Sequence, residues 1–151
     1  MRVDNLDAAF LPDTTNVVSD NPTAQKLGHR LFFDRRLSAN GNVACASCHK
    51  PDLAFTDGLE TSIATGVSKR NAPSLIGSSY SPWFYWDGRK DSLWSQALSP
   101  LEDPAEHSGN RSFYSKLIHS DQLYKKSYEE IFGVMPALDD SGRFPRMEGP
   151  F

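Results

Sequence analysis

The chain has 151 residues, with 16 Lys and Arg against 19 Asp and Glu, and a formal net charge of −3. This length suits one domain, and the mild acidity argues against a nucleic-acid partner. Hydrophobic residues make up 38% of the chain. No stretch approaches the roughly 20 apolar residues of a membrane-spanning helix.

The N-terminal stretch, residues 1–21, is polar, contains Pro12 and is expected to form an arm. Met1–Leu6 lack the apolar segment of a secretory leader. We therefore expect either a mature or recombinant form of the protein or a piece of something longer.

A helix is predicted to begin at Asn21, a good N-cap that precedes Pro22 at the first helical position. It is expected to end near Asp34. His29 in this helix is interpreted as a surface histidine. One face of the helix is apolar and carries Ala24, Leu27 and Leu31.

After a turn-rich connector, the chain reads Cys45-Ala46-Ser47-Cys48-His49, the C-x-x-C-H attachment pattern of a c-type haem. Two thiols on one helical turn can each add to a haem vinyl group, and the imidazole that follows can ligate the iron. A redox disulfide or half of a zinc site are other uses of C-x-x-C. The chain has no other cysteine and no βαβ pattern, so we predict covalent haem c. Such attachment normally occurs outside the cytoplasm, which favours a periplasmic protein.

A long loop is predicted over residues 50–71, where it would wrap the haem edge. The four aromatic residues at 83–86 are expected either to pack against the haem or a helix, or to form an electron path. The next helix is capped by Ser92 and should end at Pro100.

Two more helices are predicted, one starting near Asn110 and one capped by Ser120 and stopped by Gly133. The predicted fold is therefore mainly α, a cytochrome c-like helical domain with long loops around one covalently bound haem. The haem domain would cover residues 22–133, and residues 134–151 would be irregular.

The second face of the iron decides the function, because a strong sixth ligand makes an electron carrier and an open face makes an enzyme. Met135 precedes Pro136, a familiar setting for an axial thioether, although it also suits a gap in the core. The candidate sixth ligands are Met135, Met147, His29, His107 and His119.

Peroxide chemistry at an open face needs a general acid/base that moves a proton between the two oxygens. Glu102, Asp103 and Glu106 follow Pro100, and Gln96 lies one helical turn before it. Carboxylates in such a loop usually only contact solvent. The residues alone therefore do not decide whether Glu106 is an acid/base or a solvated side chain.

The order of several short motifs resembles the N-terminal domain of bacterial di-haem cytochrome c peroxidases, a family that includes the enzyme maturing methylamine dehydrogenase. The resemblance covers roughly residues 22–110. The motifs are Leu27–Asp34, Cys45–His49, Phe55–Gly58, Arg70–Leu75, Trp86–Arg89 and Gln96–Glu106.

This resemblance implies a peroxidatic haem with His49 as its proximal ligand and Glu106 as the distal acid/base for O–O cleavage. Gln96 and Pro100 match other distal-pocket positions. Trp86 matches a tryptophan between two haems that is read as an electron route. Asn71 matches a residue that helps to hold calcium.

Two departures from the family pattern matter. Thr65 stands where many members carry a histidine that blocks the iron, so an iron that is five-coordinate or water-bound is expected. A second C-x-x-C-H is absent, so a second haem domain would lie in a missing part of the protein or in another chain, unless this is a single-haem relative. The calcium prediction is weaker for the same reason.

The favoured function is reduction of H2O2 to water with electrons from a small redox protein. One alternative is a mono-haem electron-transfer cytochrome with a Met or His sixth ligand. The other is a maturation-type oxidase that uses high-valent iron on a protein.

Overall fold

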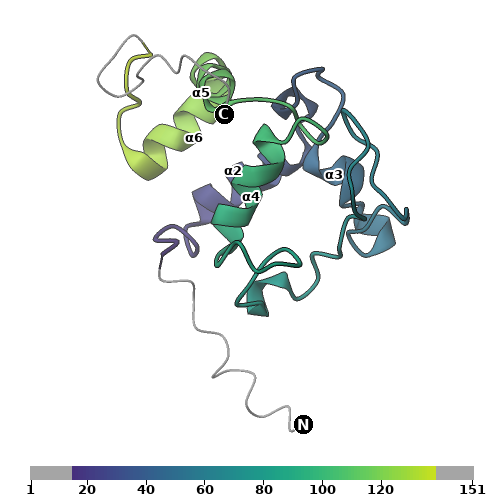
Figure 1. Ribbon diagram of the computed structural model, residues 1–151. Coiled ribbons are helices and arrows are strands. Elements are labelled where there is room, and N and C mark those ends of the chain that lie inside the picture. The colour runs from purple at the N-terminus through teal and green to yellow at the C-terminus, as the bar shows by residue number, and fades with distance from the viewer. Residues whose placement is uncertain (1–14, 139–151) are drawn as a thin grey trace, which may run out of the picture.

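The computed structural model describes residues 15–138, and within them the fold is mainly α, as predicted (Figure 1). Strand pairing in this part of the chain is limited to isolated bridges, among them Lys50 with Thr56 and Ile63 with Val67. The helices are α2 (Pro22–Phe33), α3 (Cys45–Cys48), α4 (Leu93–Glu102), α5 (Arg111–Ser120) and α6 (Gln122–Phe132). Short 3₁₀ turns are η2 (Arg35–Leu37), η3 (Pro51–Leu53) and η4 (Ser78–Tyr80).

Local capping explains where most helices begin. The Asn21 side chain accepts hydrogen bonds from the backbone of Thr23 and Ala24, and the Asn110 side chain accepts one from Phe113. The cap at Asn21 was predicted, and α5 was predicted to start near Asn110. The chain leaves α6 at Gly133 with a φ of 85°. Such a positive φ favours glycine, which has no Cβ to clash.

The predicted cap at Ser120 is wrong by one residue. The Asp121 side chain caps α6 by accepting hydrogen bonds from the backbone of Leu123 and Tyr124. Ser120 instead ends α5, and its hydroxyl donates to the carbonyl of Leu117. A carboxylate that accepts two backbone N–H groups is the stronger cap at the positive end of a helix.

The prediction that α4 ends at Pro100 is also wrong, because the helix runs on to Glu102. Proline removes only its own N–H, so the bond to the carbonyl four residues earlier is lost while its fixed φ stays helical. The next turn still closes, with the N–H of Asp103 donating to the carbonyl of Ser99 at 3.1 Å.

A three-helix scaffold is formed by α2, α5 and α6. Helix α2 packs against both α6 and α3, and α5 packs against α6. Figure 1 shows α5 and α6 at one end and α3 on the other side of α2. The α2–α6 contact is fastened by the Tyr124 hydroxyl, which donates to Asp34 Oδ2 at 2.6 Å.

The stretch between α3 and α4 makes a wide turn and will be called the 50–91 loop (Figure 1). Its own hydrogen bonds are mostly local, such as the Ser68 N–H donating to the carbonyl of Ser62 at 2.9 Å. Several of its large apolar side chains are exposed, and the buried apolar core is small. That core comprises Leu37, Val43, Ala44, Ala72, Tyr114 and Tyr124 among the described residues.

The predicted domain limits fall partly outside the described residues. Residues 1–14 of the predicted arm and 139–151 of the predicted C-terminal segment are not described. Thr15 contacts α4, because the Trp94 indole N–H donates to its hydroxyl at 2.8 Å. Between residues 15 and 138, every helix is too short or too polar to cross a membrane.

Candidate haem site

Helix α3 presents both cysteine thiols from a single turn. Its first turn is closed by the Ser47 hydroxyl, which accepts a hydrogen bond from the Ala44 N–H at 3.0 Å. Cys45 and Cys48 are free thiols and partly buried. Burial raises the pKa of both thiols. A raised pKa favours the thiol over the thiolate, which is the form that reacts in disulfide formation.

His49 follows the cysteines as the C-cap of α3, and its ring is oriented from one side. Nδ1 lies 3.0 Å from the carbonyl oxygen of Phe55, so Nδ1 carries the proton and donates. Nε2 is the nitrogen left to bind a metal, in the arrangement by which a second hydrogen bond fixes a ligating histidine. The sequence had not indicated this carbonyl.

The Phe55 carbonyl is placed by an unusual turn. Ala54 and Phe55 both have left-handed backbone, with φ of 53° and 60°. A left-handed conformation costs a non-glycine residue about 1–2 kcal/mol. The turn is closed by the Phe55 N–H, which donates to the carbonyl of Lys50 at 2.8 Å. Two successive residues thus adopt a strained backbone in the turn whose carbonyl binds the imidazole of His49.

Exposed apolar side chains line the elements that follow His49. They belong to the 50–91 loop and to α4, and water solvates such side chains poorly. A porphyrin is a large flat apolar body, and burying such side chains against it would be favourable. These residues fit a haem held by α3. They are Leu53, Leu59, Ile63, Val67, Ile76, Trp83, Leu93, Trp94 and Leu98.

The loop after α4 carries Glu106 and is held from the 50–91 loop by backbone hydrogen bonds. The Thr65 N–H donates to the Glu106 carbonyl at 3.1 Å, and the Gly66 N–H donates to the Ala105 carbonyl at 2.9 Å. Gly66 fits closely here, because a Cβ at this position would lie 3.3 Å from the Ala105 backbone. Thr65 and Glu106, which lie 41 residues apart in the chain, are thereby neighbours.

Glu106 is half-buried and lies within electrostatic reach of the C-x-x-C-H helix. Its negative charge raises the pKa of Cys45 and Cys48 further, beyond the effect of burial. Burial, and after it the charge of Asp103, raise the pKa of Glu106 itself, while the Arg89 guanidinium lowers it. A half-buried carboxyl with a raised pKa, within electrostatic reach of Cys45 and Cys48, is suited to exchange protons.

Gln96 and Pro100 lie four residues apart on α4 and share one face of it. Both are partly buried. The carbonyl of Pro100 accepts a hydrogen bond from the His107 N–H at 3.1 Å, which ties the end of α4 to the Glu106 loop. The structure thus joins the predicted distal residues in one continuous segment, Gln96–His107.

Trp86 and Asn71 lie on the outside of the described structure. Trp86 is 81% exposed, and the Arg70 guanidinium lies over its ring, 5.6 Å from the centroid. Asn71 is exposed. Between residues 15 and 138, no group of three or more His, Cys, Asp or Glu side chains could hold a metal ion. Calcium at Asn71 stays a prediction.

The candidate sixth ligands are scattered. His29 is exposed, and its ring packs on Phe33 with 5.1 Å between centroids. His107 commits Nδ1 to the Leu37 carbonyl at 2.7 Å. Met147 lies outside the described residues. His119 and Met135 lie at the end of α5 and beyond α6, so ligation by any of these residues stays a prediction.

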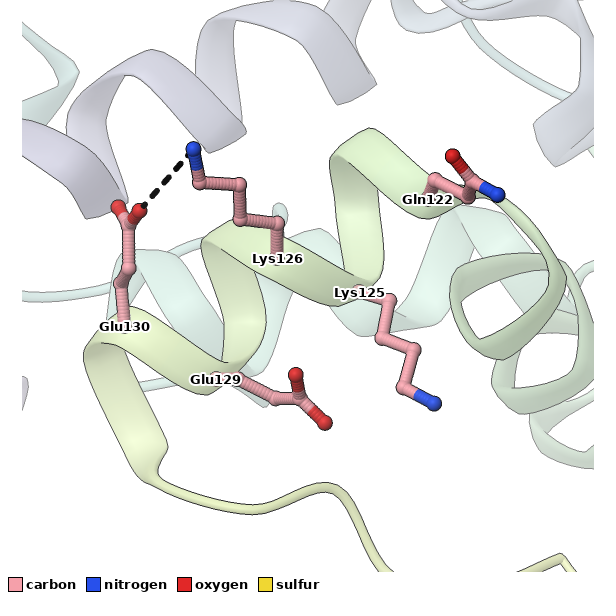
Figure 2. Close-up of a pocket in the computed structure, with 5 residues that line it drawn as sticks. All are labelled: Gln122, Lys125, Lys126, Glu129 and Glu130. Carbon is pink, nitrogen blue, oxygen red and sulfur yellow. Dashed lines mark ion pairs between the residues drawn. The ribbon is translucent and has the colours of Figure 1, made fainter.

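A surface hollow on α6 is unrelated to this site. Figure 2 shows that all five of its lining residues come from α6 and are polar or charged. Lys126 and Glu130 form an ion pair one helical turn apart, with Nζ 4.0 Å from the carboxylate. Such a pair on an exposed helix face contributes little to stability.

Residues 22–147 match the di-haem cytochrome c peroxidase family. The chain belongs to this family. Membership confirms the resemblance drawn from the sequence and implies haem c as the cofactor, in agreement with the thiols and imidazole of α3. The mainly helical, cytochrome c-like fold predicted from the sequence is also confirmed.

Individual relatives are similar over most of this chain but are much longer. A cytochrome c551 peroxidase of Nitrosomonas europaea is 34% identical over 119 residues, which cover 78% of this chain and 36% of the relative. The methylamine utilization protein MauG of Methylorubrum extorquens is 35% identical over 114 residues, covering 74% and 32%. The diheme peroxidase BthA of Burkholderia thailandensis superposes with a TM-score of 0.69 at 30% identity, over 89% and 38% of the two chains. This family member therefore spans about a third of the length of these relatives.

Three interactions near the candidate site of this peroxidase-family chain were not predicted from the sequence. The Phe55 carbonyl and the Leu37 carbonyl are backbone acceptors, which no side-chain pattern reveals. Arg89 belongs to the Trp86–Arg89 motif. Its effect in lowering the pKa of Glu106 could be recognised only from the folded structure.

Proposed function

We propose that this chain is the peroxidatic haem domain of a di-haem peroxidase and reduces H2O2 to water. Cys45 and Cys48 would attach one haem c, and His49 would be the proximal ligand. Glu106 would be the distal acid/base. The observation that carries the proposal is the half-buried Glu106 within electrostatic reach of both thiols, with its pKa raised by burial.

The chain's part in the reaction is to move one proton. A bound haem supplies the iron at which the peroxide O–O bond breaks. The ionised carboxylate of Glu106 would take a proton from one oxygen of the peroxide and return it to the other, which would leave as water. Two electrons and two protons convert H2O2 into two waters in all. The Gln96 amide would orient the peroxide, and Pro100 would shape the pocket wall.

Electrons must come from outside this chain. A small redox protein would be the donor, and a second haem domain, in the remainder of the protein or in another chain, would pass them on. The exposed indole of Trp86 would be the point of entry, and Asn71 would contribute to a calcium site at that junction. The length of the relatives supports this arrangement. A periplasmic location follows from covalent haem attachment.

Thr65 bears on whether the distal face is open. The Thr65 N–H donates to the Glu106 carbonyl, so the backbone of Thr65 lies beside that of the proposed acid/base. A hydroxyl is a poor ligand for haem iron compared with imidazole or thioether. We infer that the resting iron is five-coordinate or water-bound and needs no ligand displacement before peroxide binds.

Glu106→Gln tests the proposal, with Glu102→Gln as the matched control. Glu102 is an exposed carboxylate in the same segment and pairs with Arg111 at 3.0 Å. Stopped-flow mixing of the haem-loaded ferric protein with H2O2 should show a rate about 10²–10⁴-fold lower for Glu106→Gln. Glu102→Gln should react like the wild type. Equal rates for the two variants would refute the acid/base role.

Of the alternatives, a mono-haem electron carrier is not favoured, because the relatives carry the names of peroxidases and of MauG. A methionine or histidine bound as the sixth ligand of the iron would favour the electron carrier instead. The resting-state absorption or EPR spectrum decides this, since a low-spin six-coordinate iron differs from a high-spin open one.

A further inference from the structure

His107 follows Glu106 and is one of the most buried polar residues, with 4% of its surface exposed. Its ring Nδ1 lies 2.7 Å from the carbonyl oxygen of Leu37, a residue 70 positions away. Its own carbonyl accepts a hydrogen bond from the Ala39 N–H at 2.9 Å. Side chain and backbone of His107 thus bind the same short segment, residues 37–39.

We propose that His107 is a positioning residue that sets the distance of Glu106 from the haem-attachment helix. This inference rests on the proposed role of Glu106 and adds the element that fixes its place. His107 would not bind peroxide or iron.

The segment held by His107 leads directly to α3. Ser38, which is 1% exposed, accepts a hydrogen bond on its hydroxyl oxygen from the Val43 N–H at 3.0 Å. Val43 and Ala44 are buried, and the Cys45 helix begins immediately after them. A path of buried residues and hydrogen bonds therefore runs from the Glu106 loop through His107 and residues 37–44 to the first cysteine.

The hydrogen bonding specifies one form of the ring. A carbonyl only accepts, so Nδ1 of His107 must carry the proton and donate to the Leu37 oxygen. The Tyr114 hydroxyl lies 3.0 Å from the same oxygen and 2.6 Å from the Leu101 carbonyl. The tyrosine hydroxyl has one proton, and the Leu101 carbonyl is its nearer acceptor. The Leu37 oxygen therefore depends on His107 for its donor, and losing the imidazole leaves a buried acceptor less satisfied.

The other side of Glu106 is held as well. Its N–H donates to the Asp103 carbonyl and its carbonyl accepts from the Thr65 N–H, both at 3.1 Å. These bonds link the Glu106 loop to α4 and to the 50–91 loop. Within residues 15–138, the hydrogen bonds that link this loop to the segment leading into α3 are those of His107. Proton transfer depends steeply on donor–acceptor geometry, and a displacement of about 1 Å can cost about 10²-fold in rate.

The test compares His107→Asn with His107→Gln and His107→Leu in the haem-loaded protein. An asparagine amide can place an N–H close to the position of Nδ1, whereas glutamine places it nearer to Nε2 and leucine has none. Tyr124→Phe is the control, because it removes another buried long-range hydrogen bond, in the α2–α6 contact. A loss of stability alone would affect this control in the same way.

Two rates are measured across pH, the reaction with H2O2 and the association of cyanide with the ferric iron. Hydrogen cyanide must lose its proton on binding, so its association reports the distal base without turnover. We expect His107→Leu and His107→Gln to be about 10- to 100-fold slower in both rates. We also expect a displaced pH midpoint in these two variants. His107→Asn should stay close to the wild type.

The positioning role is refuted if all three His107 variants keep the rates and pH midpoint of Tyr124→Phe while Glu106→Gln is slow. It is equally refuted if His107→Asn is as slow as His107→Gln, which would mean that the Nδ1 hydrogen bond is not what matters. If Glu106→Gln itself reacts like the wild type, the acid/base role proposed for Glu106 is refuted, and the positioning role of His107, which rests on it, is refuted as well.

Discussion

The contact between α2 and α6 allows a stability prediction with a definite pH dependence. Asp34 accepts hydrogen bonds from the Tyr124 hydroxyl at 2.6 Å and from Arg36 Nη2 at 2.7 Å. The Arg36 guanidinium is the main cause that lowers the pKa of Asp34 from 3.8 to about 2, with burial opposing it. Asp34→Asn keeps the shape of the side chain and removes its charge.

The size of the effect follows from the pKa. One unit corresponds to about 1.4 kcal/mol, so the drop to about 2 sets an upper limit near 2.5 kcal/mol. Arg36 is 53% exposed, and water screens its attraction. We therefore expect Asp34→Asn to lower the free energy of unfolding at pH 7 by about 1–2 kcal/mol.

Proton linkage determines how the stabilisation by Asp34 changes with pH. A carboxyl whose pKa is lower in the folded state stabilises the fold above its unfolded pKa of about 4. That stabilisation is lost as the pH falls toward the folded value of about 2. The difference between wild type and Asp34→Asn should therefore be largest at pH 5–7 and shrink toward zero near pH 2.

Urea denaturation of the haem-loaded protein, followed by far-UV circular dichroism from pH 7 to pH 2, measures this difference. Asp52→Asn, at an exposed carboxylate in η3, is the matched control and should change little. A difference that stays constant down to pH 2, or one that is absent at pH 7, would show that the charge of Asp34 does not stabilise the α2–α6 contact.

Two further predictions concern the distal side. In the proposed mechanism the ionised form of Glu106 would accept the proton, so the rate with H2O2 should rise with pH through its pKa. Asp103→Asn removes a charge that raises this pKa and should shift the profile to lower pH, whereas Arg89→Gln should shift it to higher pH; shifts in one direction would contradict this assignment. Thr65→His should convert a high-spin resting ferric spectrum to a low-spin one and slow the reaction with H2O2, and a wild type that is already low-spin would refute the open-face interpretation.

Features that depend on neighbouring residues were predictable from the sequence. The C-x-x-C-H turn and the caps at Asn21 and Asn110 are set by residues within one turn of each other. The cap of α6 shows the limit of such reasoning. Ser120 and Asp121 are adjacent and both are good caps, and only the hydrogen bond from Ser120 to the end of α5 decides between them.

Features that depend on distant contacts were not predictable. The approach of His107 to Leu37 joins residues 70 positions apart, and the acceptor is a backbone carbonyl that any residue would provide. His107 was interpreted as a candidate sixth ligand because a histidine near a haem is read first as a ligand. Its burial and its partner become visible only when the chain is folded.

The small core explains why these long-range hydrogen bonds matter for the site. The scaffold of α2, α5 and α6 has its own fastening in the Asp34–Tyr124 contact, but the large apolar side chains of the 50–91 loop are exposed. Each such side chain contributes about 1.5–3 kcal/mol when fully buried, so a haem packed against several of them would stabilise the loop. Apolar packing is non-directional and cannot by itself set the position of one carboxylate. The directional constraints on Glu106 must therefore come from hydrogen bonds, and those of Thr65, Gly66, Asp103 and His107 are among the ones that meet at its loop.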